Sequence, residues 1–256
     1  MKKLKTGILG MGYIGASHID AVRRIPECEL WAVADANEEL ARRKAEYYQV
    51  PKCYASIDAL LEDPEIEVIH NCTPNNLHTE INKKILAAGK HLLSEKPLAL
   101  NFQEAQSLLE VHRAHPESVA AVNFNYRMNP MVQEMRARVA SGEVGKINGV
   151  HGCYLQDWLL YDLDYSWRLE PEIAGPSCCV ADIGSHWMDL VEHVTGERIV
   201  ELVADLRTTF PVRKKPLKQT ETFSTGRETP CEEVPVKNEE YASVIFRLSG
   251  GATGSY

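Results

Sequence analysis

The chain carries the segment TGILGMGYIG at residues 6–15, and this segment decides the fold of its N-terminal half. Its apolar start, Thr6–Leu9, predicts a β-strand, and Ile14–Arg24 has the spacing of an amphipathic helix. Between them, GMGYIG matches the pattern G-x-G-x-x-G, whose glycines allow a tight turn, close approach of the backbone to a pyrophosphate, and helix–strand packing. The helix N-terminus then offers free N–H groups to phosphates. The segment predicts a dinucleotide-binding loop, against the alternative of a turn that binds no ligand.

An acidic residue follows the second predicted strand, Leu30–Ala34, and supports this interpretation. Asp35 lies at the end of that strand, where a carboxylate accepts hydrogen bonds from the adenosine ribose hydroxyls. A carboxylate there repels a 2′-phosphate, and no arginine follows it directly. The predicted cofactor is therefore NAD, with NADP as the weaker candidate. The alternative is that Asp35 is an ordinary surface residue.

Strand and helix patterns alternate through the first 123 residues, which predicts βαβ units and a doubly wound parallel sheet with helices on both faces. After Asn123 the pattern changes to longer strands. We expect a Rossmann domain at 1–123 and an α+β domain with a large open-faced mixed or antiparallel sheet at 124–256. The fold class is therefore α/β.

Three segments of the second half have specific predictions. Lys146–Gln156 is expected to be a long strand, Asp182–Val194 a helix, and Pro211–Val236 an exposed loop. The chain stops after GGATGSY, which has the composition of a hairpin turn and leads us to expect an incomplete C-terminal domain.

Composition excludes several classes of protein. The formal net charge is −8, and no block of lysine or arginine is present, which disfavours nucleic acid as a partner. The 7 cysteines are scattered, which is typical of reduced thiols in a cytoplasmic protein. Glycines interrupt the first apolar run, which disfavours a signal peptide, and no apolar run approaches the length of a membrane span.

Four segments carry a resemblance to a known family: GILGMGYIGASHI, CTPNNLHTE, AAGKHLLSEKPLAL and VADIGSHWMDL. With these, the chain resembles the glucose–fructose oxidoreductase and inositol dehydrogenase family, called Gfo/Idh/MocA. The resemblance implies an N-terminal Rossmann domain and a C-terminal domain whose open-faced sheet often builds a homodimer or homotetramer. It also implies sugar, polyol or related substrates.

Oxidation of a carbinol carbon requires a base for the hydroxyl proton and a donor for the resulting alkoxide. Lys96 follows a predicted strand, His91–Ser94, at the edge where open α/β sheets bind ligands, and is the candidate donor. The resemblance implies that Asp182 and His186 form the acid–base pair beside the substrate. His186 is the first candidate for the base, because its ordinary pKa lies near neutrality, and Asp182 would orient it or bind a substrate hydroxyl. The alternatives are that Lys96 is a solvated surface residue, Asp182 a helix-capping carboxylate and His186 a buried structural histidine.

A metal site is a rival interpretation of the same helix. Four residues recur along one predicted helical face: Asp182, His186, Asp189 and His193. Cys178 and Cys179 lie just before them. Ligands spread over three turns of one helix cannot surround a metal ion, so we predict no metal site.

The remaining candidates come from loops after predicted strands and from an aromatic loop at 156–175. Those for cofactor contact are Gly10, Met11, Gly12, Tyr13, Ile14, Gly15, Asp35, Ala36, Thr73, Pro74, Asn75, His78, Glu95, Lys96, Asn123, Trp167 and Arg168. The resemblance implies the cofactor contacts of Glu95 and of the loop Thr73–Asn75 with His78, and the alternative for that loop is an ordinary helix start. Those for substrate contact are Lys96, Tyr126, Arg127, Trp158, Asp182 and His186. The resemblance implies that Trp167 and Arg168 reach the nicotinamide pocket, whereas core packing is the commoner role of aromatic residues.

The sequence therefore predicts an NAD-dependent oxidoreductase that oxidises a secondary hydroxyl group of a sugar, polyol or anhydrosugar. Two alternatives remain open: a reductase of non-sugar carbonyl or imine groups, and a regulatory protein that binds NAD without turnover.

Overall fold

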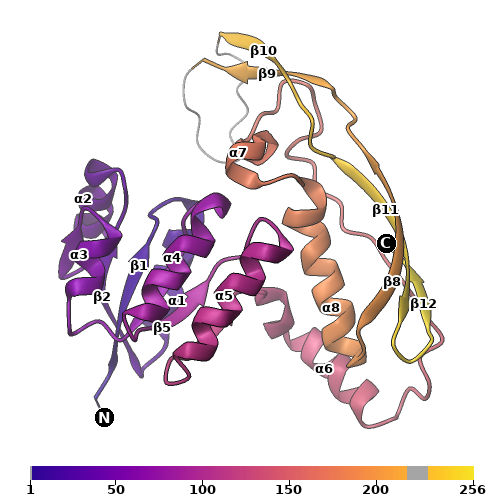
Figure 1. The fold of residues 1–256 in the computed structure, drawn as a ribbon, viewed down its shortest axis with the longest axis horizontal. Coiled ribbons are helices and arrows are strands. Elements are labelled where there is room, and N and C mark those ends of the chain that lie inside the picture. Colours follow the sequence, from indigo (N-terminus) through magenta and orange to yellow (C-terminus); the bar gives the residue numbers. More distant parts are fainter. Residues whose placement is uncertain (1, 218–229) are drawn as a thin grey trace. The chain divides into compact units, whose positions relative to one another are not determined.

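The computed structural model describes residues 2–217 and 230–256, which group into two units, Met1–Asn123 and Phe124–Tyr256. Figure 1 shows the first unit from indigo to magenta and the second from magenta to yellow. Among the described residues, no helix is long and apolar enough to cross a membrane.

The first unit is built on a parallel sheet with the strand order β3-β2-β1-β4-β5-β6. Its strands are β1 (Leu4–Leu9), β2 (Cys28–Ala34), β3 (Lys52–Tyr54), β4 (Val68–Asn71), β5 (His91–Ser94) and β6 (Ala120–Val122). The order reverses between β1 and β4, which is the point where a doubly wound sheet opens a crevice for a ligand. The predicted parallel Rossmann sheet is confirmed.

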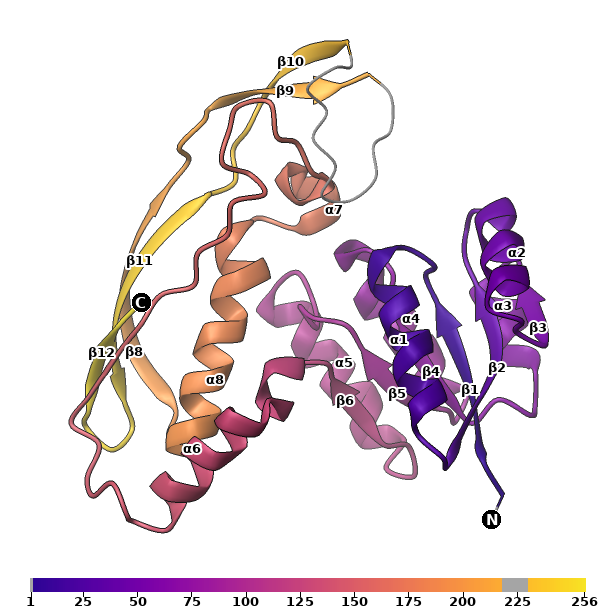
Figure 2. The same ribbon diagram turned by 180° about the vertical axis from the view of Figure 1, so that it is seen from behind.

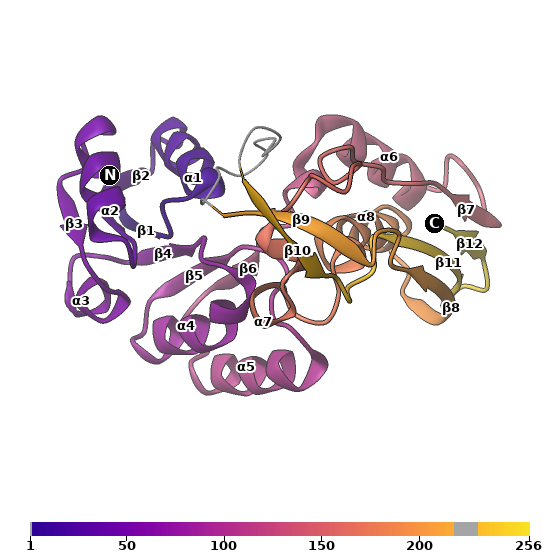
Figure 3. The ribbon, with the colours of Figure 1, turned by 90° about the horizontal axis from the view of Figure 1, so that it is seen from above.

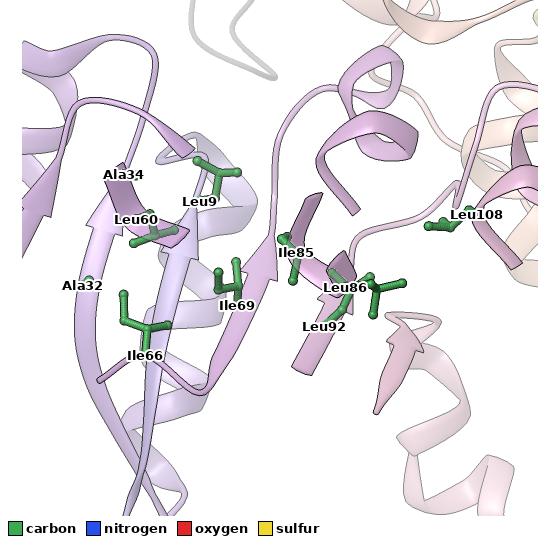
Figure 4. Packing of buried hydrophobic residues seen from close by; sticks show 10 residues of the cluster. All are labelled: Leu9, Ala32, Ala34, Leu60, Ile66, Ile69, Ile85, Leu86, Leu92 and Leu108. Carbon is green, nitrogen blue, oxygen red and sulfur yellow. The ribbon is translucent and has the colours of Figure 1, made fainter. Parts of the chain in front are cut away.

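Two layers of helices cover this sheet, one on each face. Successive strand residues point to opposite faces, so each layer packs against every second residue of a strand. The helices are α1 (Tyr13–Arg24), α2 (Glu38–Tyr47), α3 (Ile57–Glu62), α4 (Asn75–Ala87) and α5 (Phe102–Ala114). Ile8 of β1 packs with residues of α1 and α2, whereas the next residue, Leu9, packs with residues of α3, α4 and α5. Figure 4 shows the second of these clusters, and Figure 3 shows the two helix layers on either side of the strands. The asparagine side chains at the starts of α2 and α5, Asn37 and Asn101, cap those helices.

The second unit contains a mixed sheet with the order β7-β12-β11-β8. Its strands are β7 (Gly149–His151), β8 (Ile199–Arg207), β11 (Tyr241–Leu248) and β12 (Thr253–Ser255), and a separate pair is formed by β9 (Val212–Pro216) and β10 (Cys231–Pro235). The pair β12–β7 is parallel, whereas β11 is antiparallel to both of its neighbours. This confirms the predicted α+β unit with a mixed sheet.

Helix α8 (Ser185–Thr195) packs along one face of that sheet (Figure 2). Val191 and Trp187 of α8 contact Phe246 and Leu248, which alternate along β11 with exposed residues. The unit also contains α6 (Pro130–Ala140), α7 (Pro171–Ala174) and the turns η1 (Asn125–Met128), η2 (Trp167–Leu169) and η3 (Val180–Gly184).

Two predictions for the second half were wrong in part. The expected long strand at Lys146–Gln156 is limited to β7, because its partner β12 offers only three residues for pairing. The helix expected from Asp182 begins instead with η3, a π turn in which the N–H of Ser185 bonds to the carbonyl of Val180. Asp182 therefore lies in a widened turn before α8.

The predicted loop at Pro211–Val236 is strand at both flanks. Its middle, residues 218–229, lies outside the described residues. In the flanks, Lys215 faces Glu232 and Lys214 faces Glu233 across the antiparallel pair β9–β10. Opposite charges at directly opposed positions stabilise such a pair, and this charge pattern was the overlooked sequence signal.

Candidate active site

The three glycines of the loop differ in what surrounds them. A Cβ on Gly10, where φ is +93°, would lie 2.5 Å from the carbonyl oxygen of Cys72, and a Cβ on Gly15 would lie 2.1 Å from that of Gly10. A Cβ on Gly12 would meet no described atom within 4 Å. Gly12 also precedes α1 without a capping side chain. The fold therefore requires Gly10 and Gly15, whereas Gly12 leaves an open approach to the first N–H groups of α1, which suits a pyrophosphate.

Alanine at Gly12 is expected to weaken cofactor binding, whereas alanine at Gly15 is expected to destabilise the fold. Gly12→Ala keeps the fold but lowers the affinity for NADH roughly tenfold, or about 1.4 kcal/mol, because the methyl group occupies the phosphate approach. Gly15→Ala destabilises the unit by about 1–3 kcal/mol, because its Cβ meets backbone. Thermal unfolding and NADH fluorescence titration measure both. Unchanged NADH affinity in Gly12→Ala would exclude the phosphate from this position.

The carboxylate of Asp35 supports the glycine loop from the end of β2. Its Oδ2 accepts a hydrogen bond from the backbone N–H of Met11 at 2.7 Å, and its Oδ1 accepts one from Asn37 at 2.8 Å. A carboxylate has about four lone-pair sites, so Asp35 keeps capacity for the predicted ribose hydroxyls. Ala36 beside it is exposed.

His78 joins the two loops that follow β4 and β5. Its side chain is buried, with Nε2 2.8 Å from the carbonyl oxygen of Thr73 and Nδ1 2.6 Å from that of Pro97. Thr73 also donates from its hydroxyl to Asn71 at 2.7 Å. His78, predicted as a cofactor contact, is thus occupied with the backbone of these loops, and Pro74 and Asn75 form the start of α4.

Glu95 lies buried directly after β5, next to Lys96. Its Oε1 accepts hydrogen bonds from His18 Nε2 at 2.9 Å and Asn123 Nδ2 at 2.6 Å, and its Oε2 accepts one from the backbone N–H of Lys96 at 3.2 Å. Burial acts to raise the pKa of Glu95, but the bonds from His18 and Asn123 outweigh it and lower that pKa. His18 Nδ1 in turn lies 2.9 Å from His70 Nδ1. Sequence reasoning had singled out Glu95, Lys96 and Asn123, but neither histidine.

In the second unit, Asp182 forms an ion pair with Arg168. The Nε of Arg168 lies 3.0 Å from Oδ2 of Asp182, and both side chains are largely buried. The guanidinium also lies over the rings of Trp167, at 4.6 Å, and Trp158, at 5.2 Å. The structure therefore brings together four of the predicted residues of this unit. Asp182 belongs to the π turn η3, a geometry that recurs at functional sites.

His186 is buried and held by aromatic rings. Tyr126 stacks on its face with ring centres 4.3 Å apart, and Phe124 meets it edge-on at 5.7 Å. The hydroxyls of Tyr126 and Tyr154 lie 2.6 Å apart, and this hydrogen bond, with burial, raises the pKa of Tyr126 to about 12. Tyr126 is therefore a neutral hydroxyl group at physiological pH. Tyr154 had no sequence signal, since the contact depends on where β7 ends.

Arg127, a predicted substrate contact, is paired with Asp189. Its Nε lies 2.7 Å from Oδ2 of Asp189, and its Nη2 contacts the other carboxylate oxygen. This two-point contact ties η1 to α8. His193 lies against Arg136, with Nδ1 and Nη1 2.6 Å apart. Within the described ranges, no group of three or more His, Cys, Asp or Glu side chains is placed to hold a metal ion.

A pocket of about 190 Å³ opens beside Asp182. Its walls include the apolar side chains of Trp158, Leu160 and Phe210, and the polar side chains of Gln156, Asp182 and Glu240. A volume this small suits a compact molecule rather than an extended one. His186 does not belong to the wall of this pocket.

Known families match both units. Residues 4–124 match an oxidoreductase family described as having an NAD-binding Rossmann fold, and residues 132–256 match the GFO/IDH/MocA C-terminal domain. Levoglucosan dehydrogenase of Pseudarthrobacter phenanthrenivorans is 31% identical to the chain, which aligns over 100% of its own length and 67% of that relative. Myo-inositol 2-dehydrogenase of Thermotoga maritima is 27% identical over 79% of the chain and 58% of that relative.

Solved structures agree with these matches. A crystal structure of an oxidoreductase domain protein from Kribbella flavida has a TM-score of 0.91 and 31% identity, and the chain covers 67% of it. Levoglucosan dehydrogenase in complex with NADH and L-sorbose has a TM-score of 0.89 and 31% identity, with 66% of it covered. The chain thus spans about two thirds of these proteins, and less of several curated relatives.

Proposed function

Because the chain belongs to the Gfo/Idh/MocA family of oxidoreductases, we propose that it is an NAD-dependent dehydrogenase that oxidises a secondary hydroxyl group of a sugar, polyol or anhydrosugar. The N-terminal unit is an NAD-binding Rossmann domain. The observation that carries the proposal is the similarity to levoglucosan dehydrogenase along the whole chain.

Residues of the first unit would hold the cofactor and one side of the reacting group. The N–H groups after Gly12 would bind the pyrophosphate, and Asp35 would bind the adenosine ribose. When bound, the nicotinamide ring supplies the acceptor for the hydride of the substrate. Lys96 would donate a hydrogen bond to the substrate oxygen and stabilise its negative charge as the proton leaves.

Residues of the second unit would carry the proton chemistry. His186 would take the hydroxyl proton, and the face of Tyr126 fixes the plane of its ring. Asp182, held by Arg168, would orient the imidazole or bind a neighbouring hydroxyl.

Two further features of the proposal concern cofactor choice and assembly. NAD is preferred over NADP because Asp35 places a negative charge where a 2′-phosphate would bind. A homodimer or homotetramer through the sheet of the second unit is supported by its outer face, where exposed Val203 and Ile245 oppose each other on β8 and β11. A cytoplasmic location stays a prediction.

Production of NADH tests the function directly. The protein is incubated with NAD and a panel of levoglucosan, inositols, simple sugars and a non-sugar alcohol, with NADP in parallel. We expect turnover with at least one cyclic polyol or anhydrosugar, and weaker turnover with NADP. Tight binding of NADH without turnover on the panel would favour the non-sugar reductase or the regulatory protein.

A further inference from the structure

The group of His18, His70, Glu95 and Asn123, in which His18 and Glu95 are buried and the other two are partly buried, lies outside the proposed chemistry and connects four segments of the first unit. His18 belongs to α1, His70 to β4, and Glu95 and Asn123 follow β5 and β6. We propose that His18 is a positioning residue, which sets the place of Lys96 by holding the carboxylate of Glu95. The inference rests on the proposed function, because it assumes that Lys96 acts on the substrate.

The hydrogen bonds of Glu95 define what His18 does. One carboxylate oxygen, Oε1, lies 2.9 Å from His18 Nε2 and 2.6 Å from the amide nitrogen of Asn123. The other oxygen, Oε2, accepts the backbone N–H of Lys96 at 3.2 Å. An ionised carboxylate only accepts hydrogen bonds, so Nε2 of His18 carries a proton. His18 thereby fixes the plane of the carboxylate that holds the Lys96 backbone.

The second nitrogen of His18 is fixed as well. Its Nδ1 lies 2.9 Å from Nδ1 of His70, with the two rings edge to face at 78°. Burial, and then the nearby His18, lower the pKa of His70 to about 3, so His70 is neutral. Because each nitrogen has a partner, the His18 ring is held in one orientation. Its hydrogen bond then holds the carboxylate of Glu95 in one orientation too.

The position of the group argues for more than stability. Replacing a buried carboxylate and its partner by apolar side chains of the same volume often costs little net stability. This group lies where the strands β4, β5 and β6 end, the edge at which open α/β sheets bind ligands. His18 of this group lies on α1, the helix whose first turn follows Gly12. The group therefore links the helix proposed to bind the pyrophosphate to the residue proposed to bind the substrate oxygen.

Two substitutions separate the two nitrogens of His18. The amide nitrogen of glutamine reaches the place of Nε2, whereas that of asparagine reaches only the place of Nδ1. In His18→Asn we expect kcat to fall about 10- to 100-fold, since a displacement of about 1 Å can cost 10²-fold. KM and the affinity for ADP-ribose, which lacks nicotinamide, should change little. His18→Gln should keep most of kcat.

A second readout does not depend on turnover. In protein labelled with ¹⁵N-lysine, the backbone signal of Lys96 is assigned by its loss in Lys96→Arg. We expect that signal to shift in His18→Asn and to stay in His18→Gln. If the parent chain oxidises no sugar, the proposed function fails, and this NMR comparison alone decides whether His18 positions Lys96.

Several outcomes would overturn the inference. Equal loss of kcat in both His18 variants, unchanged kcat in His18→Asn, or a Lys96 signal that ignores the substitution each contradict it. If both variants fail to fold, Glu95→Gln, which keeps the volume and removes the charge, replaces them. In that variant, an unchanged kcat and an unchanged Lys96 signal contradict the inference, and a fall with a shift supports it.

Discussion

A Lys96→Ala variant is expected to oxidise its sugar about 10²- to 10³-fold more slowly than the parent chain, with little change in NADH affinity. The reason is the loss of one donor to the developing alkoxide, for which losses of this size are typical. Steady-state NADH production gives kcat and KM, and fluorescence titration gives the affinity for NADH.

Lys84→Ala is the matched control for this substitution. Lys84 lies on α4 and pairs with Asp58 at the surface, so its removal should leave kcat unchanged. If Lys96→Ala retained the kcat of Lys84→Ala, Lys96 would not be the donor, and the alkoxide would need another stabilising group.

Substitution of His186 by asparagine should be at least as damaging, with a fall in kcat of about 10²- to 10⁴-fold. Asparagine cannot accept the hydroxyl proton at neutral pH, although it retains polarity beside the ring of Tyr126. Thermal unfolding is measured in parallel, because His186 is buried.

His193→Asn makes the same chemical change two turns further along α8, at a half-buried residue that contacts Arg136. It should behave as the parent chain. If His186→Asn were as active as His193→Asn, another residue would have to be the base.

The kcat of the double variant Lys96→Ala/His186→Asn should fall little below that of the slower single variant, because the effects of groups that act in one step are not additive. Fully multiplicative losses would indicate that Lys96 and His186 act independently of each other.

The sheet of the first unit could be predicted because its pattern is local. Apolar runs, glycines after strands and amphipathic helices each lie within about 15 residues of sequence. Strand β3, Lys52–Tyr54, had no such pattern, because a three-residue edge strand with a lysine at its start has no apolar run. In the second unit, η3 was not expected, since no sequence period distinguishes a π turn from the first turn of an α-helix.

The candidate site divides in the same way. The glycine loop and Lys96 could be placed from sequence, because each follows a recognisable strand. The contact of His18 with Glu95 joins residues 77 positions apart, and the pairing of Arg127 with Asp189 joins residues 62 apart. One signal for His18 was available: it occupies the buried face of α1 together with Ile19 and Val22, where a histidine needs a partner.

The position of β1 between β2 and β4 has a consequence for the order in which the protein is made. A chain that leaves the ribosome N-terminus first exposes the glycine loop and β2 before β4, so β1 can pair with β2 first. The other wall of the loop is the backbone at Cys72, against which Gly10 packs, and it arrives only with β4. Until then the turn proposed to bind the phosphates has only one of its two walls. Cellular NAD can therefore begin to stabilise the nascent protein only after β4 has paired with β1.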